Sequence, residues 1–547
     1  MTEIHLCLGH PVFKDSDVAA VAAREGVPAA WRQAFEKYGT TAPARVSGDF
    51  AVAMELADGR SFLAIDRFAI QTLCYRVVDG RLRFAPRADA LSDAGAELDP
   101  QAIFDYLYFH VIPSPSTIFK GVLRLPPAHC ALFENQRLTV APYWAPSFDE
   151  HGGESFADLR EEFLGLVRDA VGSRLEQGTT GCYLSGGTDS STVAGMLTKI
   201  TGRPAETYSI GFDVQGYDEM EYARIAVRHF GTRHHEYYVT PDDLVAGMPM
   251  VAASYDQPFG NSSAVPAYYC ALKAKQDGID NLLAGDGGDE LFGGNTRYAK
   301  QRVFGIYDAL PGSLRRGLAE PLTDSGLFDR IPLLKKGASY VRQARVPMPD
   351  RMQTYNLLMR MGLDQVFTAG FLHKIDAGEP DRQQREVYAT CPPASLVNKM
   401  LAYDWRYTLA ENDLPKVVGS ARLAQVSVGF PLLDDRLLEF SLKLPTSYKL
   451  KGFKLRWFFK EALRGFLPNE ILTKKKHGFG LPFGTWAVSH APLKKLAADS
   501  LHGLTARNIV RPEFVDRLLN EYLPEHPGFY GELVWILTML EQWLQAH

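Results

Sequence analysis

The loop LSGGTDSS, residues 184–191, lies between a short apolar run and a run of good helix formers. Its two glycines let a bulky anion approach the backbone closely. The first N–H groups of the following helix have no partners within that helix, and this end carries a partial positive charge. The small hydroxyl groups of Ser185, Ser190 and Ser191 can add hydrogen bonds. The loop therefore predicts an anion cradle, most simply for phosphate.

Apolar, strand-like runs alternate with helical patterns from this loop onward. The strand-like runs fall at 181–184, 206–212, 234–239 and 281–285, and helical patterns at 191–200 and 218–230 separate the first three. Strands that alternate with helices indicate an α/β fold with a doubly wound parallel sheet. Such sheets bind ligands at the carboxyl ends of their strands, which is where the loop would lie.

The first part of the chain has a different pattern. Up to about residue 143, apolar runs are separated by Asp-Gly and Asn-Gln turns, which is typical of a β-rich unit. The segment APSFDEHGGESF at 145–156, rich in glycine, serine and acids, ends this pattern. We therefore expect two domains, a β-rich one at 1–148 and an α/β one at 149–547 that becomes mainly helical in its last third.

Composition narrows the range of functions. The net charge of −5 is small for 547 residues and gives no reason to expect a nucleic-acid partner. No apolar run approaches the ~20 residues of a membrane-spanning helix, and the N-terminus lacks the pattern of a signal peptide. The six cysteines are scattered without a C-x-x-C pair, which favours a reducing compartment. We therefore expect a cytoplasmic protein that binds neither nucleic acid nor membrane.

The loop has a resemblance that extends along the chain. It lacks the lysine of a Walker P-loop. It resembles the pyrophosphate loop of the ATP pyrophosphatase superfamily, and the chain is similar to the asparagine synthetase group, which includes the β-lactam synthetases and the lasso-peptide cyclases. Further matching segments follow in the group's order: YSIGF at 208–212, LAGDGGDELFGGNTRY at 283–298, GFPLLDDRLLEFSLKLP at 429–445 and KKKHGFGLPFGTW at 474–486.

The resemblance implies an activity and a set of site residues. Enzymes of this group adenylate a carboxylate with ATP and Mg²⁺, release pyrophosphate, and let an amine attack the activated acyl group. The implied roles are pyrophosphate binding by Ser185, Gly186, Gly187, Asp189 and Ser190, Mg²⁺ binding by Asp189 and Asp289, adenine contact at Ile210 and Gly285, and charge stabilisation by Lys476. Two acids on separate loops suit a metal that takes oxygen ligands and bridges phosphates. A fixed cation counts most where water is scarce.

Simpler interpretations exist for some of these residues. Without the other motifs, Asp189 would be an ordinary acid at a helix N-terminus, and Lys476, in the run TKKK, would belong to a solvated surface. His234 and His235 resemble a metal pair, but neighbouring residues of a strand point to opposite faces, so we interpret them as structural.

The front domain departs from the glutamine-using members of the group. Those members begin with Met-Cys, whereas residue 2 here is Thr2, and Cys7 lies inside an expected strand. No segment similar to NGEIYN is present, and the resemblance to the group's front domain begins only at SGDFAV, residues 47–52. We therefore predict a shortened domain without glutaminase activity, serving as a scaffold or a peptide-docking surface.

Two departures concern the substrate. Asp286 stands where asparagine synthetases have Glu and β-lactam synthetases have Tyr, and its carboxylate could orient or deprotonate an amine. Ser427 and Gly429 replace a Glu and an Arg of the group. The loss of both charges predicts a roomier pocket and argues against a small charged substrate such as aspartate.

Two classes of function remain, an ATP-dependent ligase that uses an amine and a non-catalytic binding scaffold. The loop, both metal acids and Lys476 favour the ligase, because a scaffold has no need to keep them together. Within the ligases we rank a lasso-peptide macrolactam cyclase first, before an ammonia-dependent asparagine synthetase and a small-molecule lactam synthetase. This ranking predicts a peptide substrate, with a precursor-peptide protease or a leader-binding protein as partner.

Overall fold

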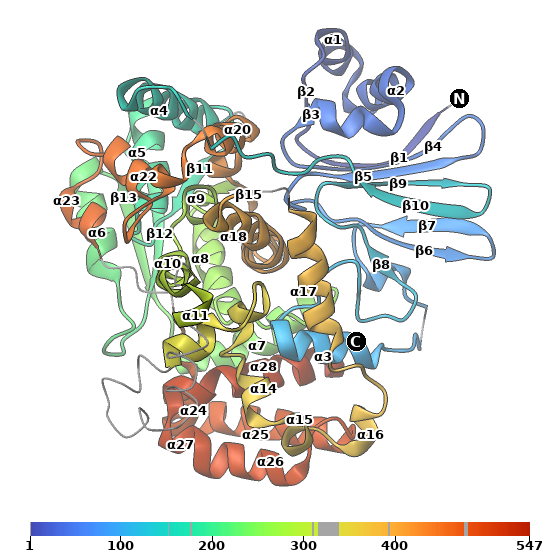
Figure 1. Ribbon diagram of the computed structural model, residues 1–547, viewed down its shortest axis with the longest axis vertical. Coiled ribbons are helices and arrows are strands. Elements are labelled where there is room, and N and C mark those ends of the chain that lie inside the picture. Colours follow the sequence, from blue (N-terminus) through green and yellow to red (C-terminus); the bar gives the residue numbers. More distant parts are fainter. Residues whose placement is uncertain are drawn as a thin grey trace.

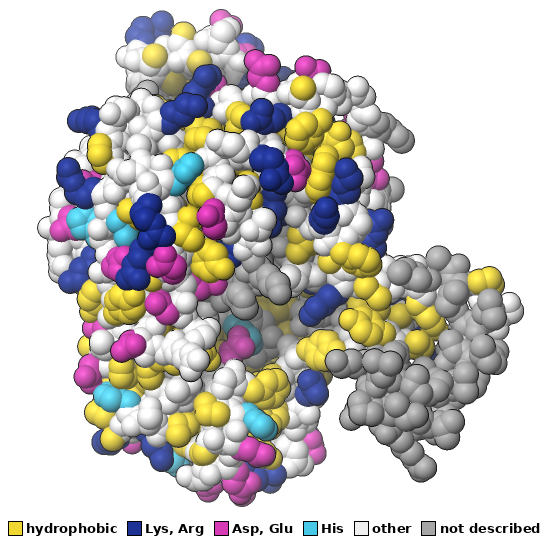
Figure 2. All heavy atoms as spheres, turned by 90° about the vertical axis from the view of Figure 1, so that its left-hand side faces the viewer, with side chains coloured by type: hydrophobic (Ala, Val, Ile, Leu, Met, Phe, Trp, Pro, Cys, Tyr) yellow, Lys and Arg dark blue, Asp and Glu magenta, His cyan; other side chains and the backbone are white. Residues whose placement is uncertain are grey.

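The computed structural model describes residues 2–93, 95–150, 152–175, 178–308, 311–314, 339–391, 394–474 and 480–547. Lys476 lies outside these residues, so its role remains a prediction. Figure 1 shows the β-rich front part beside the α/β part, with the C-terminal helices packed below the parallel sheet. On the face seen in Figure 2, basic and acidic side chains are intermixed. Within the described ranges, none of the helices combines the length and apolarity needed to cross a membrane.

The front part contains two antiparallel sheets of three or more strands, and a two-stranded one formed by β2 (Val12–Phe13) and β3 (Val46–Ser47). The larger has the order β1-β4-β5-β9-β10, and the smaller has the order β7-β6-β8. Their bounds are β1 Glu3–Gly9, β4 Phe50–Glu55, β5 Ser61–Ile65, β6 Cys74–Val78, β7 Arg81–Ala85, β8 Leu123–Arg124, β9 His129–Glu134 and β10 Arg137–Pro142. This arrangement confirms the β-rich prediction.

Strand β4 explains why the front sequence is apolar without alternation. Phe50 and Val52 pack toward the helices α1 (Ser16–Glu25) and α2 (Val27–Tyr38), whereas Ala51 and Ala53 pack toward the smaller sheet. Successive side chains of a strand point to opposite faces, so a strand covered on both faces needs apolar residues at every position.

The second part contains a parallel sheet of five strands in the order β13-β12-β11-β14-β15. The bounds are β11 Thr180–Tyr183, β12 Glu206–Gly211, β13 Arg233–Tyr238, β14 Asn281–Leu283 and β15 Ser427–Gly429. After β11 the chain adds β12 and β13 on one side, then returns to place β14 on the other. The strand order therefore reverses between β11 and β14, which is the position where open α/β sheets bind ligands.

Helices cover both faces of this sheet, as a doubly wound fold requires. One face carries α4 (Phe156–Gly172), α5 (Thr188–Thr201) and α6 (Met220–Phe230), and the other carries α7 (Pro241–Ser254), α8 (Ala264–Gln276) and the C-terminal α28 (Pro527–Ala546). Leu282 and Leu283, adjacent in β14, belong to the two different cores. The predicted fold class is confirmed.

Ion pairs join the front part to the α/β part. Glu411, whose side chain is 3% exposed, pairs with Arg124 of β8 and accepts a hydrogen bond of 2.6 Å from the Ser114 hydroxyl. Arg174, just after α4, pairs with the buried Asp49 at 3.1 Å. A buried charge is costly unless a partner compensates it, so these contacts hold the two parts in one relative position.

Candidate active site

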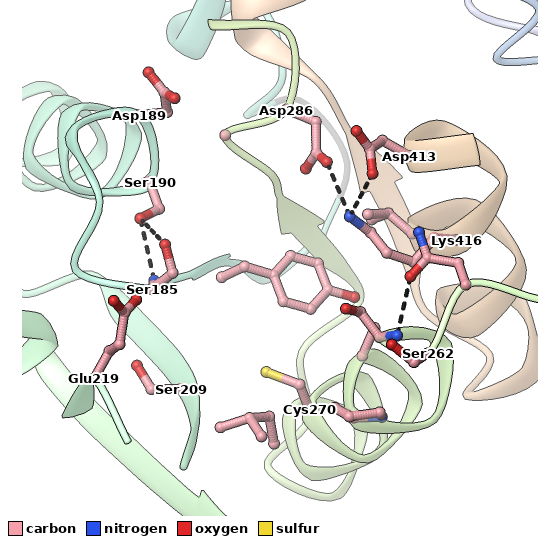
Figure 3. Close-up of a pocket in the computed structure, with 18 of the residues that line it drawn as sticks. Ser185, Asp189, Ser190, Ser209, Glu219, Ser262, Cys270, Asp286, Asp413 and Lys416 are labelled. Carbon is pink, nitrogen blue, oxygen red and sulfur yellow. Dashed lines mark hydrogen bonds and ion pairs between the residues drawn. The ribbon is translucent and has the colours of Figure 1, made fainter. Parts of the chain in front are cut away.

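A cavity of about 560 Å³ lies at the point where the strand order reverses. Its walls come from the loops after β11 and β14, from β12, and from the N-terminal ends of α8 and of α19 (Leu414–Leu423). Figure 3 shows the Ser185–Ser190 loop on one side and the Asp286–Lys416 group on the other. Ile210 and Gly285, the two positions expected to meet adenine, also line the cavity.

The phosphate-type loop, residues 185–190, brings two small hydroxyl groups together at the start of α5. The Ser185 and Ser190 hydroxyl oxygens lie 3.0 Å apart, and the Ser185 backbone N–H donates to the Ser190 hydroxyl at 3.1 Å. Gly186 has φ +67°, and a Cβ there would lie 2.3 Å from the backbone nitrogen of Ala223. Gly187 is the N-cap residue of α5, and among the described residues no side chain accepts a hydrogen bond from the first N–H groups of this helix. Backbone N–H groups at this end are therefore available to an anion.

Glycines also let the second loop approach the first. A Cβ on Gly285 would lie 2.6 Å from the Ser190 backbone nitrogen, and one on Gly288 would lie 2.3 Å from the Asp189 carboxylate. Gly288 begins the short helix α9 (Gly288–Phe292), which carries Asp289 in its first turn. Because no side chain separates the loops, the carboxylates of Asp189 and Asp289 converge.

A third residue joins these two acids. Arg456, at the N-terminus of α22 (Trp457–Ala462), places its Nη1 at 2.8 Å from Asp189 Oδ2 and 2.7 Å from Asp289 Oδ1. Its Nη2 makes a further contact with the other oxygen of Asp189. One nitrogen atom lies within hydrogen-bond distance of both carboxylates, so their oxygens are close together, and hard oxygen donors of this kind suit Mg²⁺. The residues present therefore fit the metal that the resemblance implies.

On the opposite wall, Asp286 belongs to a group of three charged side chains. The Lys416 ammonium lies 3.5 Å from Asp286 and 3.3 Å from Asp413. Burial raises the pKa of Asp286, although the nearby ammonium opposes this effect. Burial also acts to lower the pKa of Lys416, but the two carboxylates outweigh it and the pKa of Lys416 is raised. The lysine therefore remains a cation that holds Asp286 in place.

The front part contributes to the wall as well. His110 follows α3 (Pro100–Phe109) with φ +66°, and its carbonyl accepts a hydrogen bond from the Gly260 N–H at 2.8 Å. His110 lines the cavity together with Glu532 of α28, and its Nδ1 lies 3.6 Å from the Glu532 carboxylate. The cavity is thus built from both parts of the chain.

Several site residues could not be identified from the sequence, because they are distant in the chain from the loops after β11 and β14. Arg456 and His110 stand in segments without a distinctive local pattern. Lys416 had a signal, since it lies in LPKVVGSARLA at 414–424, which resembles a segment of the asparagine synthetase group, and Asp413 directly precedes that segment. The spacing alone could not show that these residues face Asp286.

Two further predicted positions are placed away from the cavity. Ser427 and Gly429 form β15 at the sheet edge, and neither is among the described residues that line the cavity. The expectation that they enlarge the pocket therefore finds no counterpart in the described walls. In β13, the neighbouring His234 and His235 make separate contacts, with Thr207 at 3.0 Å and Glu206 at 2.8 Å.

Together, the two loops and the strand reversal define a nucleotide-binding α/β domain. Residues 162–545 match the family model described as asparagine synthase, so the chain belongs to the asparagine synthase family. Residues 31–144 match the model of a glutamine amidotransferase domain. This match begins at residue 31, inside α2, and so earlier than the expected residue 47.

Named relatives agree with this assignment. The chain is 24% identical over 520 residues to glutamine-hydrolyzing asparagine synthetase 1 of Bacillus subtilis, covering 93% of this chain and 79% of the relative. It is 23% identical over 535 residues to amidase chry2 of Gibberella zeae, covering 88% and 76%. Family membership identifies an ATP-dependent ligase of the asparagine synthetase type and confirms the resemblance found in the sequence.

Proposed function

We propose that this ligase closes a macrolactam ring in the precursor of a lasso peptide, by joining the peptide's N-terminal amine to an Asp or Glu side chain. In the first step, an oxygen of that side chain attacks the α-phosphorus of ATP, and pyrophosphate leaves. In the second step, the amine nitrogen attacks the activated carbonyl carbon, AMP leaves, and the nitrogen loses a proton. The overall change in the peptide is the loss of one water.

The first step uses the loops after β11 and β14, where the strand order of the sheet reverses. Backbone N–H groups at the start of α5 and the hydroxyls of Ser185 and Ser190 would bind the phosphate oxygens. Asp189 and Asp289 would hold Mg²⁺, which neutralises charge on the phosphates when it is bound. Lys476 would add a positive charge near the reacting carbonyl.

The second step needs a proton acceptor. An α-amino group has a pKa near ~8, so much of it carries an extra proton at neutral pH. Burial raises the pKa of Asp286 and makes it a better proton acceptor than an exposed aspartate. Lys416, 3.5 Å away, would fix the direction of this carboxylate.

The charge of the cavity wall favours a peptide substrate over free aspartate. Among the described lining residues, Lys416 is the one Lys or Arg, and it already pairs with Asp286 and Asp413. The α-carboxylate of free aspartate would find no unpaired Lys or Arg on these walls. Uncharged polar groups, Asn261 and Ser262 among them, suit the amides of a peptide backbone instead.

The test of this function is dehydration of a peptide. A leader-free precursor peptide, taken from a gene beside that of this protein, is incubated with the protein, ATP and Mg²⁺ and followed by mass spectrometry. We expect the loss of one water, located between residue 1 and an acidic side chain. Holding both ends of one chain makes the attack intramolecular, which removes much of the entropic barrier.

Two control peptides sharpen this experiment. Acetylation of the N-terminus and replacement of the acidic acceptor by its amide should each prevent the loss of water. Conversion of free aspartate and ammonia to asparagine, without dehydration of any peptide, would overturn the proposal in favour of an ammonia-dependent asparagine synthetase.

A second expectation is that the protein releases no glutamate from glutamine. Cys7 pairs with Val52 in the middle of the β1–β4 ladder, and burial raises the pKa of its thiol. Burial also raises the pKa of Cys74, and raises that of Cys130 to about 11. Thiols with raised pKa values are poor nucleophiles. Incubation with glutamine and ATP should therefore yield background glutamate in both the parent and a Cys7→Ala variant, and glutamate release lost in that variant would contradict this.

A further inference from the structure

The guanidinium of Arg456 occupies the space between the two acids to which the proposed function gives the metal. Its Nη1 contacts Asp189, Asp289 and the Thr188 hydroxyl, at 2.8, 2.7 and 3.0 Å. The two carboxylate oxygens share one nitrogen and so lie within two hydrogen-bond lengths of each other. The steps described above do not use this residue.

Arg456 is held firmly in this position. Its side chain is 5% exposed, and its guanidinium carbon lies 4.0 Å from the centre of the Phe459 ring. Gly288 and Gly294 leave the room that it fills, because a Cβ on either would lie within 3.0 Å of an Arg456 atom. Its backbone has φ +53°, which is uncommon for a residue with a side chain. Arg456 is thus a built-in partner of the two acids rather than a surface side chain that happens to reach them.

The charge of this group determines what it can bind. The guanidinium offsets part of the negative charge of the two carboxylates, so that they attract a divalent cation less than they would without it. ATP brings several more negative charges to the same place. A divalent cation should therefore gain enough attraction to enter only when the nucleotide is present.

We propose that Arg456 makes binding of the divalent cation depend on the nucleotide. It is a positioning residue: its guanidinium fills the space between Asp189 and Asp289 and repels a free metal ion, so that the ion displaces the guanidinium only together with the triphosphate. This inference rests on the proposed function, since it takes these two acids as the metal ligands.

The experiment measures binding of Mn²⁺ by electron paramagnetic resonance, with and without α,β-methylene-ATP. In the parent protein we expect weak binding of Mn²⁺ alone and much tighter binding with the nucleotide analogue. In Arg456→Met, Mn²⁺ alone should bind tighter by on the order of 100-fold, because a repelling unit charge about 4 Å away is gone. Mn²⁺ without nucleotide should also raise the melting temperature of this variant, and not that of the parent.

Three further variants of this protein serve as controls in the Mn²⁺ experiment. Arg456→Gln, which keeps hydrogen-bond donors without the charge, should behave like Arg456→Met and replaces it if the latter does not fold. Arg456→Lys should restore the dependence on nucleotide. The pair Arg456→Met with Asp289→Asn should lose the tight binding of Mn²⁺, because one of the two ligands is removed.

The outcomes separate this inference from the proposed function. Equal binding of Mn²⁺ by the parent with and without nucleotide, or unchanged binding in the uncharged variants, would overturn the role of Arg456 alone. Failure of the parent to bind Mn²⁺ even with the nucleotide analogue would instead overturn the metal site on which both depend.

Discussion

Replacement of Asp289 by asparagine is expected to lower carboxylate-dependent release of pyrophosphate by roughly 10²–10³-fold, the cost of losing one group that stabilises transition-state charge. The Asp289 carboxylate shares the Nη1 atom of Arg456 with Asp189 and is a proposed ligand of Mg²⁺. Asparagine keeps the size of the side chain but removes its charge. The measurement is a coupled assay of pyrophosphate, with AMP quantified in the same samples.

The matched control for this variant is Glu221→Gln. Glu221 lies on α6 and pairs with Arg228 at the surface, at 2.8 Å, so this change also removes one acid but should leave the rate unchanged. Circular dichroism shows whether both variants remain folded. Production of ADP and phosphate, instead of AMP and pyrophosphate, would refute the adenylation step itself.

The second large effect concerns Asp286. Asp286→Asn is expected to keep carboxylate-dependent ATP–pyrophosphate exchange but to slow amide formation by roughly 10²–10⁴-fold, the usual contribution of a general base. The carboxylate lies 3.5 Å from Lys416, on the wall opposite the phosphate-type loop, so its loss should spare the first step. An equal decrease in the rates of ATP–pyrophosphate exchange and of amide formation would show that Asp286 contributes to adenylation of the carboxylate rather than to attack by the amine.

The pH dependence gives an independent check on Asp286. Burial raises the pKa of its carboxyl, and only the deprotonated form accepts a proton. The rate of amide formation should therefore fall as the pH drops through this raised pKa, at a higher pH than for an exposed aspartate. In Asp286→Asn this acidic limb should disappear. Asp413→Asn keeps the Asp286 carboxylate, so the acidic limb should remain but move to lower pH, because the charge of Asp413 contributes to raising the pKa of Asp286.

The sequence alone determined the features that depend on neighbouring residues. Ser185, Gly186, Gly187 and Ser190 lie within six residues between β11 and α5, so the geometry of their loop follows from glycine conformation and from the helix N-terminus. The alternation of strands and helices also depends on neighbouring residues, because each helix or strand has its own hydrophobic period. This alternation indicated the parallel sheet. The family followed from several such local segments in order.

The tertiary structure alone decided which distant residues meet. Arg456 stands 167 positions from Asp289 and still lies between the two acids, and Lys416 reaches Asp286 from helix α19. His110 enters the cavity from the front part, and Ser427 and Gly429 turn out to lie in the sheet edge. No period in a sequence encodes such contacts, because they arise from the order of strands in the sheet and from the packing of helices on its two faces.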